Sequence, residues 1–292
     1  MRIVMTGATS GFGLDAAARL VEAGVDSLVI GARTPHDLPE ELQVSNVTAH
    51  WLDLEDFASV RTFAAVIGDD PIDVLALNAG IGLPRPERID NGMDKTFVVN
   101  QLAPFLLLDL LRDRLAPDAR VIFTGSIAHD PATGMMVPPD HADAKRLAYP
   151  ENDHGKPRGA LQQSLRAYAS SKLANIMTAR ELARRAPDLT VLAFDPGVVS
   201  ETRITRDFPA YMRLLNAALA PIVAFSKHSS TLGNTGRLFA LLMVDRAHDG
   251  ERGAYWSVRG KRTVLVEPSA LARDKQASAQ LWDDCMDLLD RK

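Results

Sequence analysis

Ile3-Val4-Met5-Thr6-Gly7-Ala8-Thr9-Ser10-Gly11-Phe12-Gly13, near the start of the 292-residue chain, is the stretch that decides the fold. Its apolar first part predicts a strand, and a helical pattern over residues 14–23 follows directly. Glycines between a strand and a helix allow a tight turn, and the free N–H groups at a helix start attract a phosphate. We therefore predict a strand–turn–helix unit that binds a pyrophosphate. The residues expected to form this site are Gly7, Thr9, Ser10, Gly11, Phe12 and Gly13.

The alternation of short apolar runs and longer helical patterns continues to about residue 200. Such alternation indicates βαβ units, and strands that are apolar throughout indicate a sheet covered on both faces. We predict an α/β fold with a doubly wound, Rossmann-type parallel sheet, in a single domain over residues 1–292. The expected strands are 3–5, 27–31, 47–51, 74–77, 121–124, 190–194 and 255–258, and the expected helices are 14–23, 57–67, 95–115, 161–185 and 276–289.

Two segments depart from this alternation. Residues 129–158 are polar and rich in proline and histidine, which predicts a long loop insertion before the next helix. Residues 201–230 carry bulky apolar side chains and follow the sixth strand, at the edge where open α/β sheets bind ligands. We expect this second segment to form a helical lid over a hydrophobic or aromatic small-molecule substrate.

Composition and charge argue against several classes of function. The chain has 33 Lys plus Arg against 37 Asp plus Glu, a formal charge of −4, and no basic run that would bind nucleic acid. Its single cysteine, Cys285, cannot form an internal disulfide or a cysteine-based metal cage. We expect no metal site and a reducing, cytoplasmic location. The chain opens on a predicted strand, so no signal peptide is expected, and no apolar run reaches the roughly 18 residues of a membrane span.

The residues after the second and third strands bear on the choice of cofactor. NAD sites usually carry an acidic residue after the second strand, for the ribose hydroxyls. This chain has Gly31-Ala32-Arg33-Thr34 instead, and the Arg33 guanidinium suits the 2′-phosphate of NADP. Asp37 keeps NAD as a less favoured alternative. Asp53, followed by Leu54, either accepts a hydrogen bond from the adenine amino group or caps the next helix.

Small and polar residues also follow the later strands. Asn78-Ala79-Gly80 would let the backbone pass close to a ribose, and the Ser126 hydroxyl could hold a substrate oxygen. Pro196-Gly197-Val198 ends the sixth strand. Because the carboxyl ends of parallel strands meet at one edge of a sheet, we expect these positions to converge on one ligand crevice.

Tyr168 and Lys172 are four residues apart within a predicted helix, so both side chains share one helical face. Tyrosine has a pKa of about 10, and a neighbouring ammonium favours the phenolate and lowers that pKa. The spacing alone often arises by chance, and it gains weight here from the crevice that the other motifs predict. Asn100 lies mid-helix, where asparagine is locally unfavourable, so it is expected to have a specific hydrogen-bonding role.

In their order and spacing, these motifs resemble those of the classical short-chain dehydrogenase/reductase (SDR) family, over about residues 2–202. Thr124-Gly125-Ser126-Ile127-Ala128-His129, Ser171-Lys172-Leu173-Ala174-Asn175 and Ala254-Tyr255-Trp256-Ser257 look like the branch of retinol dehydrogenases and protochlorophyllide reductases. Protochlorophyllide reductases carry a functional cysteine just after the Pro-Gly turn. Here that stretch is Val198-Val199-Ser200, which argues against that particular activity.

The resemblance implies a role for each matching residue. Tyr168 would be the general acid in ketone reduction and the base in alcohol oxidation, and Ser126 would orient the reacting oxygen. Lys172 would bind the nicotinamide ribose and lower the Tyr168 pKa, and Asn100 would support a water-linked proton path towards Lys172. The implied cofactor is NADP(H), and the implied reaction interconverts an alcohol with a ketone or aldehyde.

Three other interpretations stay open at this point. Reduction of a conjugated C=C bond is one, and a non-catalytic NADP(H)-binding sensor is another. A sugar-nucleotide epimerase would have a similar fold, but such enzymes are usually longer and have a different glycine spacing. The chain is expected to be a monomer or a homodimer. The monomer is considered because, in some relatives, extra chain before the catalytic tyrosine covers the face used for dimer formation.

Overall fold

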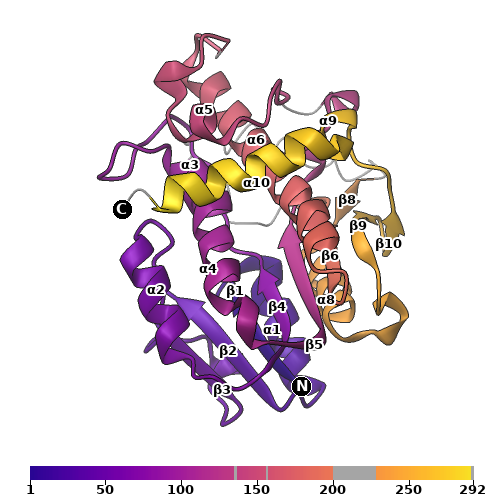
Figure 1. Ribbon diagram of the computed structural model, residues 1–292. Helices are drawn as coiled ribbons and strands as arrows, with labels where there is room; N and C mark the ends of the chain where they lie inside the picture. Colours follow the sequence, from indigo (N-terminus) through magenta and orange to yellow (C-terminus); the bar gives the residue numbers. More distant parts are fainter. Residues whose placement is uncertain (135–136, 156, 200–227, 291–292) are drawn as a thin grey trace.

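The computed structural model describes residues 1–134, 137–155, 157–199 and 228–290. Its core is one eight-stranded sheet with the strand order β3-β2-β1-β4-β5-β6-β9-β10 (Figure 1). The strands are β1 Arg2–Thr6, β2 Ser27–Ala32, β3 Val47–Trp51, β4 Ile72–Leu77, β5 Leu115–Thr124, β6 Thr190–Asp195, β9 Arg252–Arg259 and β10 Arg262–Leu265.

The seven strands from β3 to β9 pair in parallel, and only β10 pairs antiparallel, with β9. Strand β1 has β2 on one side and β4 on the other, so the strand order reverses between β1 and β4. In open α/β sheets a ligand crevice forms at the carboxyl ends of the strands beside such a reversal. The prediction of a doubly wound, Rossmann-type parallel sheet is confirmed.

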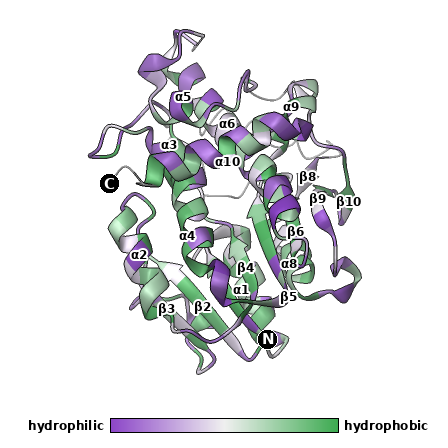
Figure 2. Cartoon of the chain, in the orientation of Figure 1, coloured by the Kyte–Doolittle hydropathy of each residue, from purple (hydrophilic) through white to green (hydrophobic). Residues whose placement is uncertain are grey.

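Helices cover both faces of the sheet (Figure 1). Helices α1 (Gly11–Glu22) and α8 (Leu232–Val244) pack on one face, around Ile3, Met5 and Ile30. The other face is covered by α2 (Phe57–Val66), α4 (Ala103–Leu111), α6 (Ala160–Arg185) and α10 (Lys275–Asp290). Figure 2 shows hydrophobic colours along the central strands and mixed colours on the covering helices, as expected for a sheet buried on both faces.

Several expected elements differ from those in the structure. The expected helix 95–115 is divided into α3 (Lys95–Phe97), a π-helical turn η2 (Val98–Leu102), α4 and the 3₁₀ turn Arg112–Arg114. Strand β5 starts at Leu115, six residues earlier than predicted, because its first part pairs with β4 before the apolar run begins. Helix α8 and strand β10 had not been predicted. Strand β3 is partly exposed, because it is an edge strand.

The insertion 129–158 is not only a loop. It contains α5 (Ala144–Ala148) and the 3₁₀ turns η5 (Pro131–Thr133) and η6 (Pro150–Asn152). Lys145 of α5 forms ion pairs with Asp284 and Asp287 of α10, at 2.8 and 2.9 Å. Charged contacts therefore join the insertion to the C-terminal helix.

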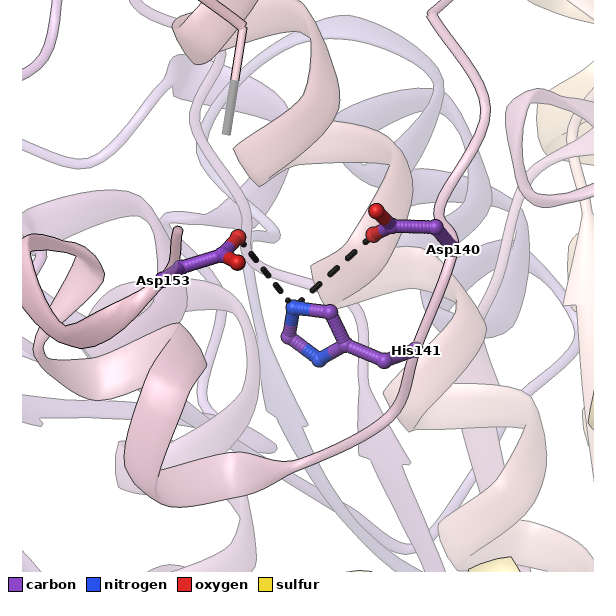
Figure 3. A group of neighbouring side chains, drawn as sticks. All are labelled: Asp140, His141 and Asp153. Carbon is purple, nitrogen blue, oxygen red and sulfur yellow. Dashed lines mark hydrogen bonds and ion pairs between the residues drawn. The ribbon is translucent and has the colours of Figure 1, made fainter. Parts of the chain in front are cut away.

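A second group of charges joins the insertion to α6. His141 Nε2 lies 3.3 Å from Asp153 and 3.8 Å from Asp140 (Figure 3). Arg146 pairs with the same Asp153 carboxylate at 2.5 Å, and Arg166 of α6 pairs with Asp140 at 2.9 Å. Because arginines already neutralise both carboxylates, we interpret this group as an ion-pair network that anchors the insertion.

The predicted lid, 201–230, lies outside the described residues apart from its last three. The flanks of that segment, β7 (Val198–Val199) and β8 (Ser229–Ser230), pair in parallel next to the carboxyl end of β6. Within the described residues, no helix combines the length and the apolar composition that a bilayer span requires.

Candidate active site

The glycine turn after β1 is packed too tightly to hold any other residue at two of its positions. A Cβ on Gly13 would lie 2.0 Å from the Gly7 carbonyl oxygen, and a Cβ on Gly7 would lie 2.8 Å from the backbone of Ala79. Gly7 also has a φ of +70°, a backbone conformation that residues with a Cβ rarely adopt. The Asn78 side chain bonds the Gly7 carbonyl at 3.0 Å and accepts from Thr124 at 2.9 Å. Asn78 therefore joins the turn to β4 and β5, a structural role beyond the one predicted.

The start of α1 is open to an anion. Its N-cap residue, Ser10, makes no side-chain capping bond, and the first turn holds no acidic residue. Gly11 has a φ of +60° and open space where a Cβ would be. A hollow of about 450 Å³ adjoins this helix start, and its lining includes Thr9, Ser10, Gly11, Asp37 and Leu232. Uncapped N–H groups beside such a hollow fit a cofactor pyrophosphate. The Phe12 side chain instead packs edge-on against Phe194 and Phe239, so only its backbone remains at the helix start.

Arg33 lies just past β2, exposed, with no hydrogen bond or ion pair to any described residue. A free guanidinium at this place fits the 2′-phosphate of NADP. Asp37 is exposed and lines the hollow at the start of α1. Leu54 is buried in the core.

The alternative that Asp53 caps the next helix is wrong. Asp56 is the N-cap of α2, and its side chain accepts from the Ala58 N–H. Asp53 instead accepts from the Glu55 N–H at 3.0 Å, while its own N–H donates to Ser59. Five residues, 52–56, separate the end of strand β3 from the helix, and Asp56 is the one whose extended backbone places a carboxylate over the free N–H groups.

Tyr168, Lys172 and Ser126 come together at the carboxyl end of β5. Tyr168 and Lys172 share one face of α6, with the Lys172 Nζ 5.8 Å from the centre of the tyrosine ring. Lys172 is 3% exposed, and its Nζ donates to the Thr124 carbonyl oxygen at 2.9 Å. Asn175 donates to the same oxygen at 3.0 Å. A Cβ on Gly80 would lie 3.2 Å from the Lys172 Nζ, so the turn after β4 reaches the same place.

The pKa values of the pair differ from the expectation. Burial raises the pKa of Tyr168 to about 12, although hydrogen bonding from Ser126 opposes the rise. Burial lowers the pKa of Lys172 to about 8. The expected lowering of the Tyr168 pKa by Lys172 is therefore not found in the protein alone. Desolvation of the phenolate is the larger effect, and the ammonium lies against a backbone carbonyl rather than the phenol oxygen.

Asn100 has the specific hydrogen-bonding role expected for a mid-helix asparagine. It sits in the π-helical turn η2, fully buried. Its side chain accepts from the Ile81 N–H at 2.8 Å and donates to the Ile81 carbonyl and the Ser171 hydroxyl, at 3.0 and 2.9 Å. Ser171 donates in turn to the Tyr168 carbonyl. Through these bonds the Asn100 side chain connects α6 to the chain after β4. The water-linked proton path towards Lys172 stays a prediction.

Asp195, at the end of β6, had not been predicted as a site residue. Its carboxyl is fully buried and accepts from the Ile127 N–H at 3.3 Å, the Gly197 N–H at 3.0 Å and the Ser257 hydroxyl at 2.5 Å. It thus holds together the Ser126 loop, the Pro196-Gly197 turn and β9. Its negative charge also helps to raise the pKa of Tyr168. An aspartate that ends an apolar strand, directly before Pro-Gly, was the signal that could have found it.

The Pro196-Gly197 turn lies where the predicted crevice requires it. Gly197 has a φ of +71°, and a Cβ there would lie 2.7 Å from the His228 carbonyl oxygen. The Pro196 carbonyl accepts from Thr235 of α8 at 3.3 Å, and Val198 starts β7. This turn therefore passes between β6 and the start of α8, next to the glycine-turn hollow.

The sequence and the structure match known proteins. Residues 1–137 match the family model described as short chain dehydrogenase. A Streptomyces sp. (strain C5) protein with the provisional name daunorubicin C-13 ketoreductase is 35% identical, over 96% of this chain and 90% of the relative. Retinol dehydrogenase 12 of Mus musculus is 31% identical over 98% and 85%. Protochlorophyllide reductase A of Oryza sativa subsp. japonica is 29% identical over 96% and 78%.

Solved structures agree with the fold. The crystal structure of an uncharacterized protein from Mycobacterium paratuberculosis has a TM-score of 0.71 and 26% identity, covering 99% of this chain and 93% of the other. NADPH-bound carbonyl reductase from chicken fatty liver has a TM-score of 0.58 and 21% identity, covering 87% and 94%. Because these relatives are matched over 78–90% of their length, the chain belongs to the short-chain dehydrogenase/reductase family of oxidoreductases, in the branch of retinol dehydrogenases and protochlorophyllide reductases.

Proposed function

We propose that this protein uses NADP(H) to interconvert a ketone or aldehyde with the corresponding alcohol. The observation that supports it most is the gathering of Ser126, Tyr168 and Lys172 at the carboxyl end of β5, beside the open start of α1. Three hydrogen-bonding groups around one point suit proton transfer to a carbonyl oxygen, and the hollow at the start of α1 suits the cofactor pyrophosphate.

Each residue has a chemical task in this proposal. The bound cofactor supplies the hydride. Ser126 donates a hydrogen bond that holds the carbonyl oxygen, and Tyr168 gives that oxygen its phenol proton. Lys172 uses one N–H on the Thr124 carbonyl, which leaves two donors for the hydroxyls of a ribose. Because its pKa is about 12, Tyr168 is protonated at neutral pH and is ready to act as an acid. This favours the direction of carbonyl reduction.

The preference for NADP over NAD rests on Arg33. Its guanidinium is exposed past β2 and makes no ion pair with a described residue, so it is available for a 2′-phosphate. The carbonyl reductase of similar fold binds NADPH, which supports the same choice. Asp37 lines the hollow at the start of α1 and would favour the free ribose hydroxyl of NAD. The balance between Arg33 and Asp37 therefore sets the preference between NADP and NAD.

Reduction of a conjugated C=C bond is the second candidate, because a protochlorophyllide reductase is among the relatives. That relative is 29% identical. The residues after Pro196-Gly197 are Val198 and Val199, and neither can transfer a proton. Tyr168 would then have to donate its proton to a carbon atom. Its position beside the Ser126 hydroxyl suits a proton transfer to oxygen instead. We therefore favour the carbonyl reaction.

The test is NADPH oxidation by the wild-type protein and Tyr168→Phe, over a panel of hydrophobic and aromatic ketones, aldehydes and enones. We expect reduced C=O products from the wild type and a loss of at least about 100-fold in kcat for Tyr168→Phe, with NADPH affinity largely retained. Tyr149→Phe, in the insertion, is the matched control and should keep its activity. Near-normal activity of Tyr168→Phe would refute the proposal. Products reduced at C=C would favour the second candidate, and cofactor binding without turnover would indicate a sensor.

A further inference from the structure

Tyr255 carries a buried hydroxyl with no hydrogen-bond partner among the described residues. It lies in β9, beside Ala193 of β6, and only 3% of its surface is exposed. Buried side-chain hydroxyls are nearly always bonded, since leaving one unpaired costs about 1–3 kcal/mol. A hydroxyl left unpaired in this way calls for an explanation, and its location supplies one.

The Tyr255 ring is held next to the residues proposed for catalysis. It meets the His129 ring edge-on, with centroids 5.3 Å apart and planes at 89°. The ring also lies against Gly125, where an added Cβ would be 3.5 Å from the tyrosine Cε2. Gly125 directly precedes Ser126. Packing against a histidine ring and a glycine fixes the direction of the phenol, so the hydroxyl has little freedom to find a partner elsewhere.

The polar groups near this hydroxyl are already engaged. His129 Nδ1 is 2.6 Å from the Ser126 carbonyl oxygen and its Nε2 accepts from the Ser269 N–H, which uses both ring nitrogens. Asp195 accepts three hydrogen bonds from other groups, and Asp130 accepts from the Ala132 N–H. No hydrogen bond joins these groups, or any other described residue, to the Tyr255 hydroxyl.

The charges around Tyr255 keep it a donor. Burial raises the pKa of Tyr255 well above its usual range, and the charges of Asp195 and Asp130 raise it further. His129 is neutral near pH 7, because burial lowers its pKa. A phenol that stays protonated beside the Asp195 and Asp130 carboxylates can offer a hydrogen, and its ring lies against Gly125, directly before Ser126.

We propose that Tyr255 is a substrate-binding residue, whose hydroxyl donates a hydrogen bond to a second acceptor oxygen that the substrate carries beside its reacting carbonyl. The preferred substrates are then ketones with a neighbouring carbonyl, ester or ether oxygen. A site with a buried polar group rejects analogues that leave the group unpaired more strongly than an apolar pocket does. This inference rests on the proposed function and narrows its substrate class.

Tyr255→Phe, saturated with NADPH, tests the proposal with two ketones of similar size. One is 1-phenylpropane-1,2-dione, which has the second oxygen, and the other is propiophenone, which lacks it. We expect the ratio of kcat/KM for the dione to kcat/KM for the monoketone to fall roughly 5- to 150-fold in the variant. The fall should come from a lower kcat/KM for the dione. Comparing ratios between two proteins cancels the intrinsic reactivity of the dione. Tyr149→Phe is the matched control and should keep the wild-type ratio.

Two further results bear on the proposal. Tyr255→Phe should be at least as thermally stable as the wild type, since it removes an unpaired hydroxyl. A clear loss of stability would mean that the hydroxyl is bonded within the protein, and would overturn the proposal. An unchanged ratio, or equal losses on both ketones, would overturn it too. If the wild type reduces neither ketone, the proposed function fails for this class. Calorimetry then measures the binding of the same two ketones to the NADP⁺ complexes of the wild type and Tyr255→Phe. A loss of affinity for the dione alone in the variant would support the role of Tyr255, and equal affinities in both proteins would overturn it.

Discussion

Replacing Lys172 by methionine is expected to stabilise the protein while removing its activity. The Lys172 side chain is 3% exposed, and burial lowers its pKa from 10.5 to about 8. This lowering of the pKa corresponds to about 3 kcal/mol of penalty for holding the ammonium charged in the folded state. Methionine has a similar length and no charge, so it removes this penalty.

Two effects reduce the expected gain. Lys172→Met loses the hydrogen bond to the Thr124 carbonyl, which contributes about 1 kcal/mol. The carbonyl is not left unpaired, because Asn175 also donates to it. The expected net stabilisation at pH 7 is about 1–2 kcal/mol, or a few degrees in the unfolding temperature. Residues that serve chemistry at the cost of stability commonly show this behaviour.

The dependence on pH identifies the cause. The folded pKa of Lys172 lies below its unfolded pKa, so the penalty is fully present below about pH 8 and disappears as pH rises towards 10.5. The stability gap between variant and wild type should therefore shrink between pH 8 and 10. Thermal unfolding at pH 7, 8, 9 and 10 without added cofactor measures this, with exposed Lys261→Met as the control. A variant less stable than wild type at pH 7, or a gap independent of pH, would refute the reasoning.

Three further predictions concern the cofactor and the proton donor. Arg33→Ala should weaken NADPH binding at least tenfold more than NADH binding in fluorescence titrations, and equal losses would mean that Arg33 does not contact the phosphate. Gly13→Ala should cost about 2–4 kcal/mol in unfolding and weaken NADPH, because its Cβ would lie 2.0 Å from the Gly7 oxygen; wild-type stability would contradict the packing. Asp195→Asn should lower the pKa of Tyr168, because a negative charge is removed. Ketone reduction should then decline at a lower pH than in the wild type, and an unshifted pH–rate profile would contradict the role of Asp195.

The fold could be predicted from the sequence because its signals are local. The turn from Gly7 to Gly13 lies between an apolar strand and an amphipathic helix, and both are the elements that the structure contains. Helix α6 was expected at 161–185 and spans Ala160–Arg185. The predictions failed where tertiary contacts override local pattern. Strand β5 starts at Leu115 because β4 offers a partner there, although Pro117 and Asp118 disfavour a strand.

The candidate site divides in the same way. Tyr168, Lys172, Ser126 and the glycine turn have recognisable residues at characteristic spacings, so the chain itself pointed to a dinucleotide and a proton donor. Asp195 and Tyr255 belong to no such spacing. Asp195 matters because it is buried and accepts hydrogen bonds from other elements, and Tyr255 matters because its buried hydroxyl has no partner among the described residues.

The sequence by itself determined the class of fold and predicted where the cofactor and the proton donor lie, because backbone geometry and helical spacing are properties of neighbouring residues. Only the tertiary structure decided the pKa values of Tyr168 and Lys172, and it reversed the expected direction of the shift for the tyrosine. The physical reason is desolvation. The free energy of a charge depends on how much water the whole fold removes from around it, and that quantity is not encoded in any short stretch of chain.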